Sequence, residues 1–308
     1  MMRRALAVFV LAVLLLPAAQ AASTGARSVI AVEFKVNDVA MADGSRFVAA
    51  GVDAKTPVSG ASDLPVWNLW NLDGSLRGAQ AADPPECPDE PAPLENCDTD
   101  AMAIAISANG ARVLVGSLLN STPQRSVIAL FTENGGLLKT ETVNGTVRDV
   151  AISADGTRMA AAIEKAAETG DPTVDGQAIA YDGNMNRMTG FPVNYETGPA
   201  EDIALSDDGS TLTVAAGGHH YYKLPSATDI LHSVSGASAR DVDVAAGGWS
   251  VSGFSNGFFG VYNNQVTQAD PSEYQKKESG DGSSIEAVAI RSDGTAFVTG
   301  SSGGTLRY

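Results

Sequence analysis

The sequence predicts an all-β protein made of repeated hairpins. Three observations predict it: apolar residues alternate with a period of two, Asp-Gly, Asn-Gly or, in one copy, Gly-Gly pairs follow the alternating runs, and this phrase recurs six times in 308 residues. Alternation puts every second side chain on one face of a strand, and Asp-Gly and Asn-Gly supply the positive-φ residues of tight hairpin turns. No long window shows the 3.6-residue period of a helix.

The six copies share an alternating run such as Asp-Val-Ala-Ile, a small polar pair, a turn glycine and a second run rich in small residues. The turn glycines are Gly44, Gly110, Gly156, Gly209, Gly248 and Gly294. Their spacings of 66, 46, 53, 39 and 46 residues average 50, which is close to the repeat of about 40 to 50 residues in a four-stranded propeller blade. We therefore expect a six-bladed β-propeller with four-stranded antiparallel blades, and a seven-bladed ring is the alternative.

The segments between the hairpins have room for two outer strands in each blade. In the second blade these are Ser126–Phe131 and Leu137–Val143, joined by a turn at Gly135 and Gly136. In the first blade Val66–Arg77 repeats the arrangement. The sequence thus predicts two further strands outside each inner hairpin.

The two ends of the chain hold complementary parts of one blade. Thr305–Arg307 can form a third strand in the last blade, which leaves that blade one strand short, and Ser28–Phe34 precedes the first inner hairpin. We expect these segments to pair, because closing the ring removes exposed sheet edges.

Residues 1–21 read as a secretory signal peptide. Arg3 and Arg4 form a basic start, Ala5–Leu16 is apolar, and Ala19-Gln20-Ala21 matches the cleavage pattern of small residues. The alternative is an uncleaved membrane anchor, although the apolar run is shorter than the roughly 20 residues that span a bilayer. We expect a secreted or periplasmic propeller domain over residues 22–308, with no membrane span after cleavage.

If the protein is exported, Cys87 and Cys97 reach an oxidising compartment, where a disulfide can form. They are the only two cysteines and lie in an acidic, Pro-rich insertion at residues 80–99. An even pair at short range in an oxidising compartment favours a disulfide that closes a loop. The acidic residues of the insertion could instead coordinate calcium, but their spacing does not match an EF-hand and a solvated loop is the simpler interpretation.

The charge balance limits the partners. Twenty Lys and Arg stand against 36 Asp and Glu, for a net charge of −16. Nucleic-acid binding is disfavoured, since such proteins gain affinity by neutralising phosphates with basic side chains. A basic protein or peptide suits this charge better.

Four aspartates occupy the same position in their repeats, near the start of the innermost strand: Asp38, Asp149, Asp202 and Asp241. In a propeller they should gather at one mouth of the central channel, where a carboxylate ring could bind a cation or a basic segment, and like-charge crowding should raise some of their pKa values. The alternative is that each aspartate only bonds to backbone amides near its own turn.

The histidines and tryptophans indicate a functional site less clearly. His219 and His220 are adjacent in an alternating run and should face opposite ways, so they are poorly placed to chelate one metal ion. Trp67, Trp70 and Trp249 could line a pocket, but aromatics in strands pack between blades more often. The chain has no G-x-S-x-G elbow, P-loop or dinucleotide-binding glycine motif.

The inner-strand phrase, as in Asp149-Val-Ala-Ile-Ser-Ala-Asp-Gly156, resembles that of the WD-repeat propeller family over nearly all of the chain after residue 21. The Gly-His that precedes the inner strand in that family is absent, and Leu69-Trp70-Asn71 only approximates the Trp-Asp ending. Quinoprotein-like propellers are therefore included in the resemblance.

We expect an exported, non-enzymatic propeller without a cofactor that binds a protein or peptide or serves as a scaffold. The alternative is a propeller enzyme or quinone-cofactor protein with its site at the channel mouth. Retention of a small ligand or metal after purification would favour the alternative.

Overall fold

The computed structural model describes residues 36–42, 47–52, 65–71, 75–81, 99–119, 124–165, 174–227, 229–232, 237–263, 277–278 and 282–308. These residues form strands and turns with no helix, which confirms the all-β prediction. They contain no helix long and apolar enough to cross a membrane. The signal-peptide segment, Cys87 and Cys97 lie outside the described residues.

The described residues form six antiparallel sheets that follow one another along the chain, and each connects its strands in sequence order. The first sheet comprises β1 (Val36–Met41), β2 (Phe47–Val52), β3 (Pro65–Asn71) and β4 (Leu76–Ala81). The second comprises β5 (Thr99–Ile106), β6 (Arg112–Leu119), β7 (Arg125–Thr132) and β8 (Leu137–Asn144). The third comprises β9 (Thr146–Ile152), β10 (Arg158–Glu164), β11 (Gly176–Asp182) and β12 (Val193–Tyr195).

The remaining three sheets repeat this plan. The fourth comprises β13 (Asp202–Leu205), β14 (Thr211–Ala216), β15 (Gly218–Lys223) and β16 (Asp229–His232). The fifth comprises β17 (Ala239–Val244), β18 (Ser250–Phe254), β19 (Phe258–Tyr262) and β20 (Lys277–Glu278). The sixth has three strands in the described residues, β21 (Ile285–Ile290), β22 (Phe297–Ser301) and β23 (Leu306–Arg307).

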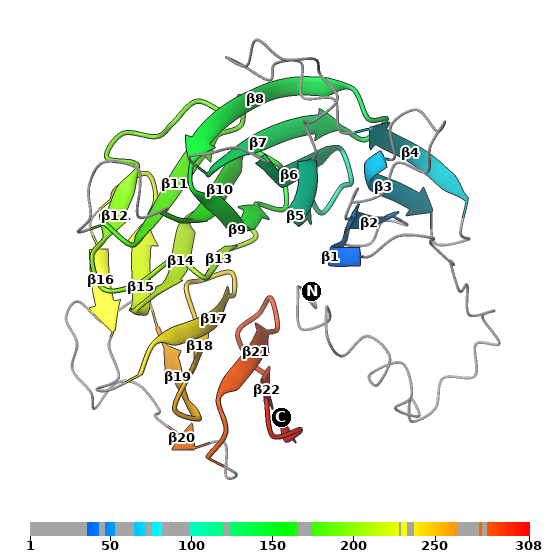
Figure 1. The fold of residues 1–308 in the computed structure, drawn as a ribbon. Helices are drawn as coiled ribbons and strands as arrows, with labels where there is room; N and C mark the ends of the chain where they lie inside the picture. Colours follow the sequence, from blue (N-terminus) through cyan, green and yellow to red (C-terminus); the bar gives the residue numbers. More distant parts are fainter. Residues whose placement is uncertain are drawn as a thin grey trace, which may run out of the picture.

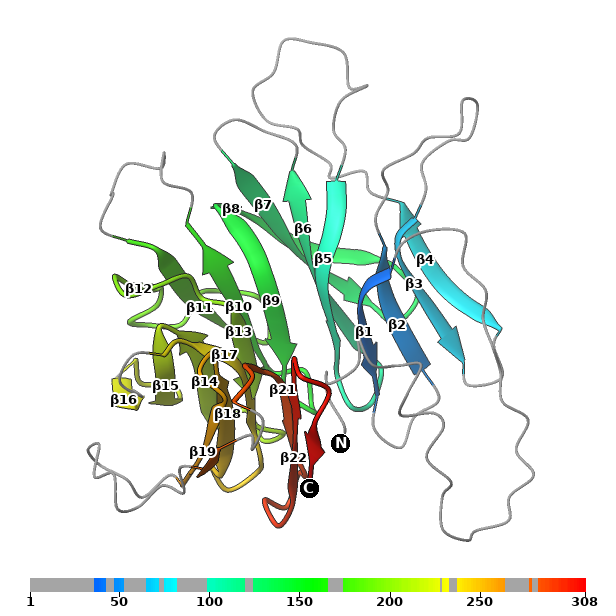
Figure 2. The same cartoon turned by 60° about the horizontal axis from the view of Figure 1, so that its bottom comes forward.

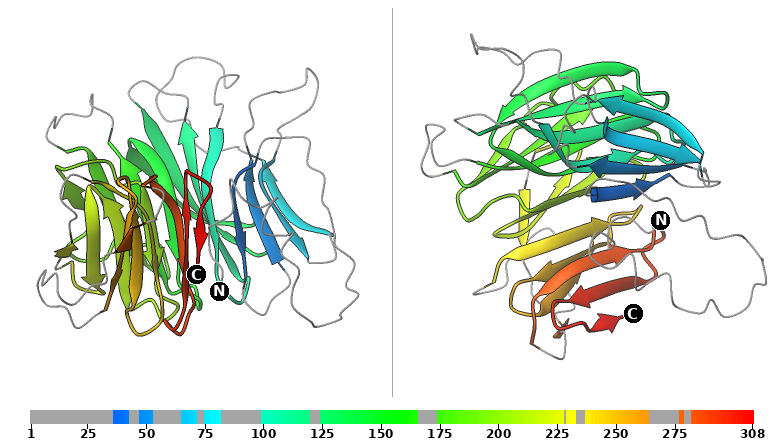
Figure 3. Two further views of the ribbon diagram at one scale, coloured as in Figure 1. Left: turned by 90° about the horizontal axis from the view of Figure 1, so that it is seen from below. Right: turned by 45° about the vertical axis from the view of Figure 1, so that its right-hand side comes forward.

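The sheets are arranged around a common centre (Figure 1). Strands β1, β5, β9, β13, β17 and β21 are innermost, and each is a neighbour of the next in this order. The outer strands β4, β8, β12, β16 and β20 lie at the periphery (Figure 1). Figures 2 and 3 show the sheets standing side by side, so that the face of one sheet meets the face of the next.

The turns between the first two strands of each sheet follow the sequence prediction where they are described. Gly110, Gly156, Gly209 and Gly294 all have φ between 65° and 72°, a region that glycine adopts without the steric cost of a Cβ. The predicted outer strands of the second sheet are also present as β7 and β8.

Apolar layers fill the spaces between neighbouring sheets. Between the third and fourth sheets, small residues such as Ala160 and Ala180 pack against Leu212 and Val214. Between the second and third sheets the layer is larger and includes Ile128 and Met159. The small side chains let the sheets approach closely, which explains why the second strand of each repeat is rich in alanine and glycine.

Gly116 shows how tight this approach is. A Cβ built on Gly116 in β6 would lie 2.4 Å from Val147 Cγ1 in β9, and Gly253 in β18 has the same relation to Ile285 in β21, at 2.3 Å. Such distances are far inside van der Waals contact, so only glycine fits at these positions while the neighbouring sheet keeps its place.

Candidate functional site

The four aspartates of the predicted ring all lie on innermost strands, and each reaches the next sheet. The Oδ2 atom of each accepts a hydrogen bond from a backbone N–H of the next innermost strand. The pairs are Asp38 with Ile104 (2.8 Å), Asp149 with Ile203 (3.0 Å), Asp202 with Val242 (2.9 Å) and Asp241 with Val288. These contacts connect the first sheet to the second and the third to the sixth in succession.

A bulge in the strand pairing precedes three of these aspartates and helps to turn their side chains towards the next sheet. In the first, third and fifth sheets the register between the two inner strands shifts directly before Asp38, Asp149 and Asp241. A bulge turns the side chain that follows it and increases the local twist. The second and sixth sheets have the same bulge but carry Ala103 and Ala287 at the aspartate position, so neither sheet can offer a carboxylate there.

Asp202 and Asp241 are neighbours, and Asp202 is only 8% exposed. Burial raises the pKa of Asp241 well above its usual range, with the carboxyl groups of Asp202 and Asp243 adding to the effect and the N–H of Val288 opposing it. Burial is thus the main cause of the raised pKa of Asp241, and the neighbouring carboxyl groups add to it.

Sequence reasoning missed Asp243, which belongs to the same group. Its Oδ2 accepts from Ile290 N at 2.9 Å and its Oδ1 accepts from Val244 N at 2.8 Å. The signal was present, since the fifth copy reads Asp-Val-Asp-Val where the third reads Asp-Val-Ala-Ile. A second aspartate on the same strand face doubles the links from the fifth sheet to the sixth.

A second set of acidic residues lies in the hairpin turns. In the third sheet Ser153 Oγ donates to Asp155 Oδ1 at 2.8 Å, and the same oxygen accepts from Thr157 N at 2.9 Å. Asp208 makes the equivalent bonds in the fourth sheet and Asn109 makes them in the second. These local bonds explain the conserved spacing of Ser, Asp or Asn, and Gly among the three copies.

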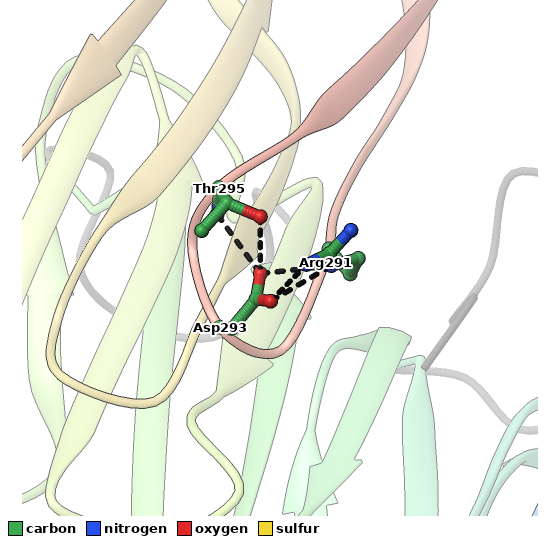
Figure 4. Close-up of polar contacts among 3 residues, drawn as sticks. All are labelled: Arg291, Asp293 and Thr295. Carbon is green, nitrogen blue, oxygen red and sulfur yellow. Dashed lines mark hydrogen bonds and ion pairs between the residues drawn. The ribbon is translucent and has the colours of Figure 1, made fainter.

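The turn carboxylates are exposed and ionised. Burial acts to raise the pKa of Asp155 and of Asp208, but the hydrogen bonds from neighbouring backbone and hydroxyl groups outweigh it and lower both. In the sixth sheet the side chain of Arg291, followed by that of Thr295, lowers the pKa of Asp293 (Figure 4). All three aspartates therefore carry a negative charge at neutral pH.

The turns also touch one another in sequence. Ala108 N donates to Ala154 O and Ala154 N donates to Asp207 O, both at 2.9 Å, and Ala246 N donates to Ser292 O at 3.0 Å. These bonds join the turns of the second, third and fourth sheets and, separately, those of the fifth and sixth. Asp155 and Asp208 therefore lie on adjacent turns, whereas Asp293 lies two sheets beyond Asp208.

The two adjacent histidines face opposite ways, as predicted. His219 Nε2 lies 3.1 Å from Ser250 Oγ and its ring stacks on Tyr262 in the fifth sheet. His220 packs against Tyr195 in the third sheet. Both side chains are buried between sheets, so the pair does not form a chelating site.

The tryptophans divide between two environments. Trp67 is fully buried and packs against Phe131 of the second sheet, with ring centroids 5.2 Å apart, as expected for an aromatic between blades. Trp70 is also buried, whereas Trp249 is 41% exposed and covers Gly294 in the next turn.

The chain matches no protein-family model, and no curated protein matches it at a significant level. Within the described ranges, no group of three or more His, Cys, Asp or Glu side chains has the geometry to hold a metal ion.

Proposed function

We propose that the six sheets close into a six-bladed β-propeller, with Ser28–Phe34 as the fourth strand of the sixth blade beside Thr305–Arg307. The faces that would meet support this proposal. Met41 in β1 is 54% exposed, and Ala287 and Val298 in the sixth sheet are half-buried. Packing the first and sixth sheets together would cover apolar surface that is otherwise in contact with water.

An experimental structure of the exported protein tests this closure. The expected result is six blades, with backbone hydrogen bonds between the two terminal segments. Five or seven blades, or an N-terminal strand paired elsewhere, would contradict it.

We further propose that the protein is an exported, non-enzymatic binding or scaffold module of the WD-repeat-like or quinoprotein-like kind, with a protein or peptide as its partner. The observation that carries the proposal is the ionised turn aspartates Asp155 and Asp208 on adjacent sheets, with Asp293, which pairs with Arg291, on a turn two sheets further along. Complementary charge steers a basic segment to such turns and fixes its register. The net charge of −16 favours the same class of partner.

The contacts between neighbouring sheets favour a rigid binding surface at these turns. Hydrogen bonds from aspartates to backbone amides and from turn to turn link neighbouring sheets, and apolar layers fill the space between them. A rigid surface loses little conformational freedom when a partner binds, which raises affinity for a given set of contacts.

A pull-down from the host's envelope or medium, with mass spectrometry of captured proteins and small molecules, tests the function. The matched variant replaces Asp155, Asp208 and Asp293 by Asn. Asn109 makes the same turn bonds in the second sheet, so the substitutions remove charge while keeping the turns.

The expected result is a polypeptide that the unmodified protein captures, that salt releases, and that the triple variant binds at least tenfold more weakly. Equal capture by both proteins would show that these turns are not the binding surface. Retention of a small ligand or metal, with no polypeptide, would favour the enzyme or quinone-cofactor alternative.

A further inference from the structure

Asn144, Gly145 and Thr146 form an Asn-x-Thr tripeptide where the second sheet passes into the third. This is the acceptor pattern for N-linked glycosylation, which attaches a sugar to an asparagine side chain in exported proteins. Asn144 is the last residue of β8 and Thr146 is the first residue of β9. A pattern of three residues is common in proteins, so its meaning depends on whether the folded structure gives these side chains another use.

Gly145 has a structural use. Its φ is 109°, and a Cβ built on it would lie 2.2 Å from the carbonyl oxygen of Glu164 in β10. Its N–H donates to Gln124 O at 2.9 Å, and its carbonyl oxygen accepts from Ser126 Oγ at 2.8 Å. The passage from one sheet to the next therefore requires glycine here, whether or not the tripeptide is modified.

The side chain of Asn144 has no such use, in contrast to two other Asn-Gly pairs of the chain. The Oδ1 atom of Asn109 accepts the backbone N–H two residues further on at 2.9 Å, and that of Asn256 does the same at 3.3 Å. Both bonds hold a turn. Within the described ranges, the side chains of Asn144 and Thr146 make no hydrogen bond or ion pair. The fold accounts for the glycine of the tripeptide but not for its asparagine and threonine.

The side chain of Asn144 also points into solvent. Strand β8 is the outermost strand of its sheet (Figure 1), and successive side chains of a strand point to opposite faces. Its odd-numbered residues face the third sheet, where Glu141 pairs with Arg187 and Val143 is part of the apolar layer. Its even-numbered residues, of which Asn144 is the last, are all exposed. A group attached to Asn144 would therefore displace no packed side chain.

Asn144 lies at the end of the second sheet that is opposite to the hairpin turns. The turn before β8 is joined to the hairpin turn of the same sheet, because Glu133 N donates to Ala111 O at 3.2 Å. From there the eight residues of β8 run away from the turns, over about 24 Å at roughly 3.4 Å per residue. A group attached to Asn144 thus begins far from the turn that carries Asp155.

We propose that Asn144 is an N-glycosylation site of the exported protein, an inference that rests on the export included in the proposed function. The donor is a sugar carried by a lipid-linked phosphate. Nδ2 of Asn144 forms a bond to the anomeric carbon of that sugar and loses one proton. The bond from the anomeric carbon to the phosphate oxygen breaks, and its electron pair leaves with the phosphate. The bulky polar product would also shield part of the open edge of β8 from pairing with another chain.

Peptide mass spectrometry of the protein purified from the host's envelope or medium tests the proposal. Trypsin cuts after Lys139 and Arg148 and releases residues 140–148, which contain a single asparagine. We expect this peptide to carry the added mass of a sugar chain. Fragmentation that keeps the sugar attached should locate it on Asn144 and not on one of the threonines of the peptide.

A matched pair of variants at Thr146 tests whether the tripeptide is the signal. Thr146→Ser keeps the hydroxyl that the acceptor pattern requires, whereas Thr146→Val keeps the shape of the side chain and removes the hydroxyl. We expect the first variant to retain the sugar and the second to lose it. Asn144→Gln should also lose it, and this third variant decides if Thr146→Val does not fold, because residue 144 is exposed.

Three results would overturn the proposal: an unmodified peptide 140–148 in protein from which residues 1–21 have been removed, a sugar located on a threonine, or a modification that persists in Thr146→Val. The first of these would leave the export and the binding function standing. Protein recovered only from the cytoplasm, with residues 1–21 still attached, would overturn the export itself and the glycosylation with it.

Discussion

Replacing Asp149 by Ala tests the inter-sheet role of the aspartates most directly. Asp149 is 6% exposed, and its Oδ2 accepts the N–H of Ile203 across the joint between the third and fourth sheets. Alanine removes the acceptor and leaves a buried amide without it. Hydrogen bonds to charged groups contribute about 1.5 to 3 kcal/mol, and an unsatisfied buried donor costs a similar amount. We expect the free energy of unfolding to fall by about 2 kcal/mol.

Asp149→Asn should have a smaller effect, because the amide oxygen can still accept. A charge-assisted hydrogen bond is roughly twice as strong as a neutral one, so about half of the loss is expected, close to 1 kcal/mol. Urea unfolding followed by linear extrapolation measures both variants, with Glu196→Gln as an exposed control that should stay within about 0.5 kcal/mol of the wild type.

The reasoning is refuted if Asp149→Ala unfolds at the wild-type urea midpoint, or if the Ile203 amide keeps its wild-type hydrogen-exchange protection in that variant. Either result would mean that the hydrogen bond contributes nothing to the joint.

The same substitutions address the predicted binding ring. If the ring is a functional surface, Asp149→Asn and Asp202→Asn should weaken binding of a basic partner or cation. Added salt should weaken this binding less than binding to exposed carboxylates, because Asp149 and Asp202 are 6% and 8% exposed and buried charges are screened less. Unchanged affinity together with altered stability would leave the aspartates as links between sheets only.

Two further predictions concern packing and covalent structure. Gly116→Ala should lower the free energy of unfolding by about 1 to 3 kcal/mol in urea titrations, because the new Cβ meets Val147 at 2.4 Å. Equal stability of Gly116→Ala and the wild type would contradict the argument. Cys87 and Cys97 should appear as one linked peptide pair in non-reducing mapping of the exported protein. Recovery of both as alkylated thiols would exclude the disulfide.

The parts of the fold that were predictable from sequence are those decided by local chemistry. The turn at Asp155-Gly156 needs a positive φ and a side chain that bonds its own backbone, and both requirements are visible in the residue types. The alternation in β7 and β8 is equally local. The turn at Ala245–Trp249 is shorter, since Ala245 N donates to Trp249 O whereas Ser153 N donates to Arg158 O, and the prediction did not distinguish it from the turns of the other copies.

The candidate site was predictable only in part. That Asp38, Asp149, Asp202 and Asp241 occupy equivalent places follows from the repeat. Which atoms they meet depends on how far one sheet is rotated and shifted relative to the next, and a single chain's periodicity carries no information on that. That Asp202 and Asp241 are neighbours is therefore a consequence of the tertiary structure.

The aspartate links between sheets are chemically one-sided. The sheet that carries the aspartate supplies a particular side chain as the acceptor. The next sheet supplies a main-chain N–H as the donor, which every residue except proline possesses. The fourth, fifth and sixth sheets can therefore change their side chains at Ile203, Val242 and Val288 without losing the donor. A copy of the repeat can therefore be duplicated, moved or diverge in sequence, and its backbone N–H can still donate a hydrogen bond to the aspartate of the preceding sheet. Ala287 in the sixth sheet illustrates this: that sheet no longer gives a carboxylate at the repeat position, yet its backbone is held at two places by the sheet before it.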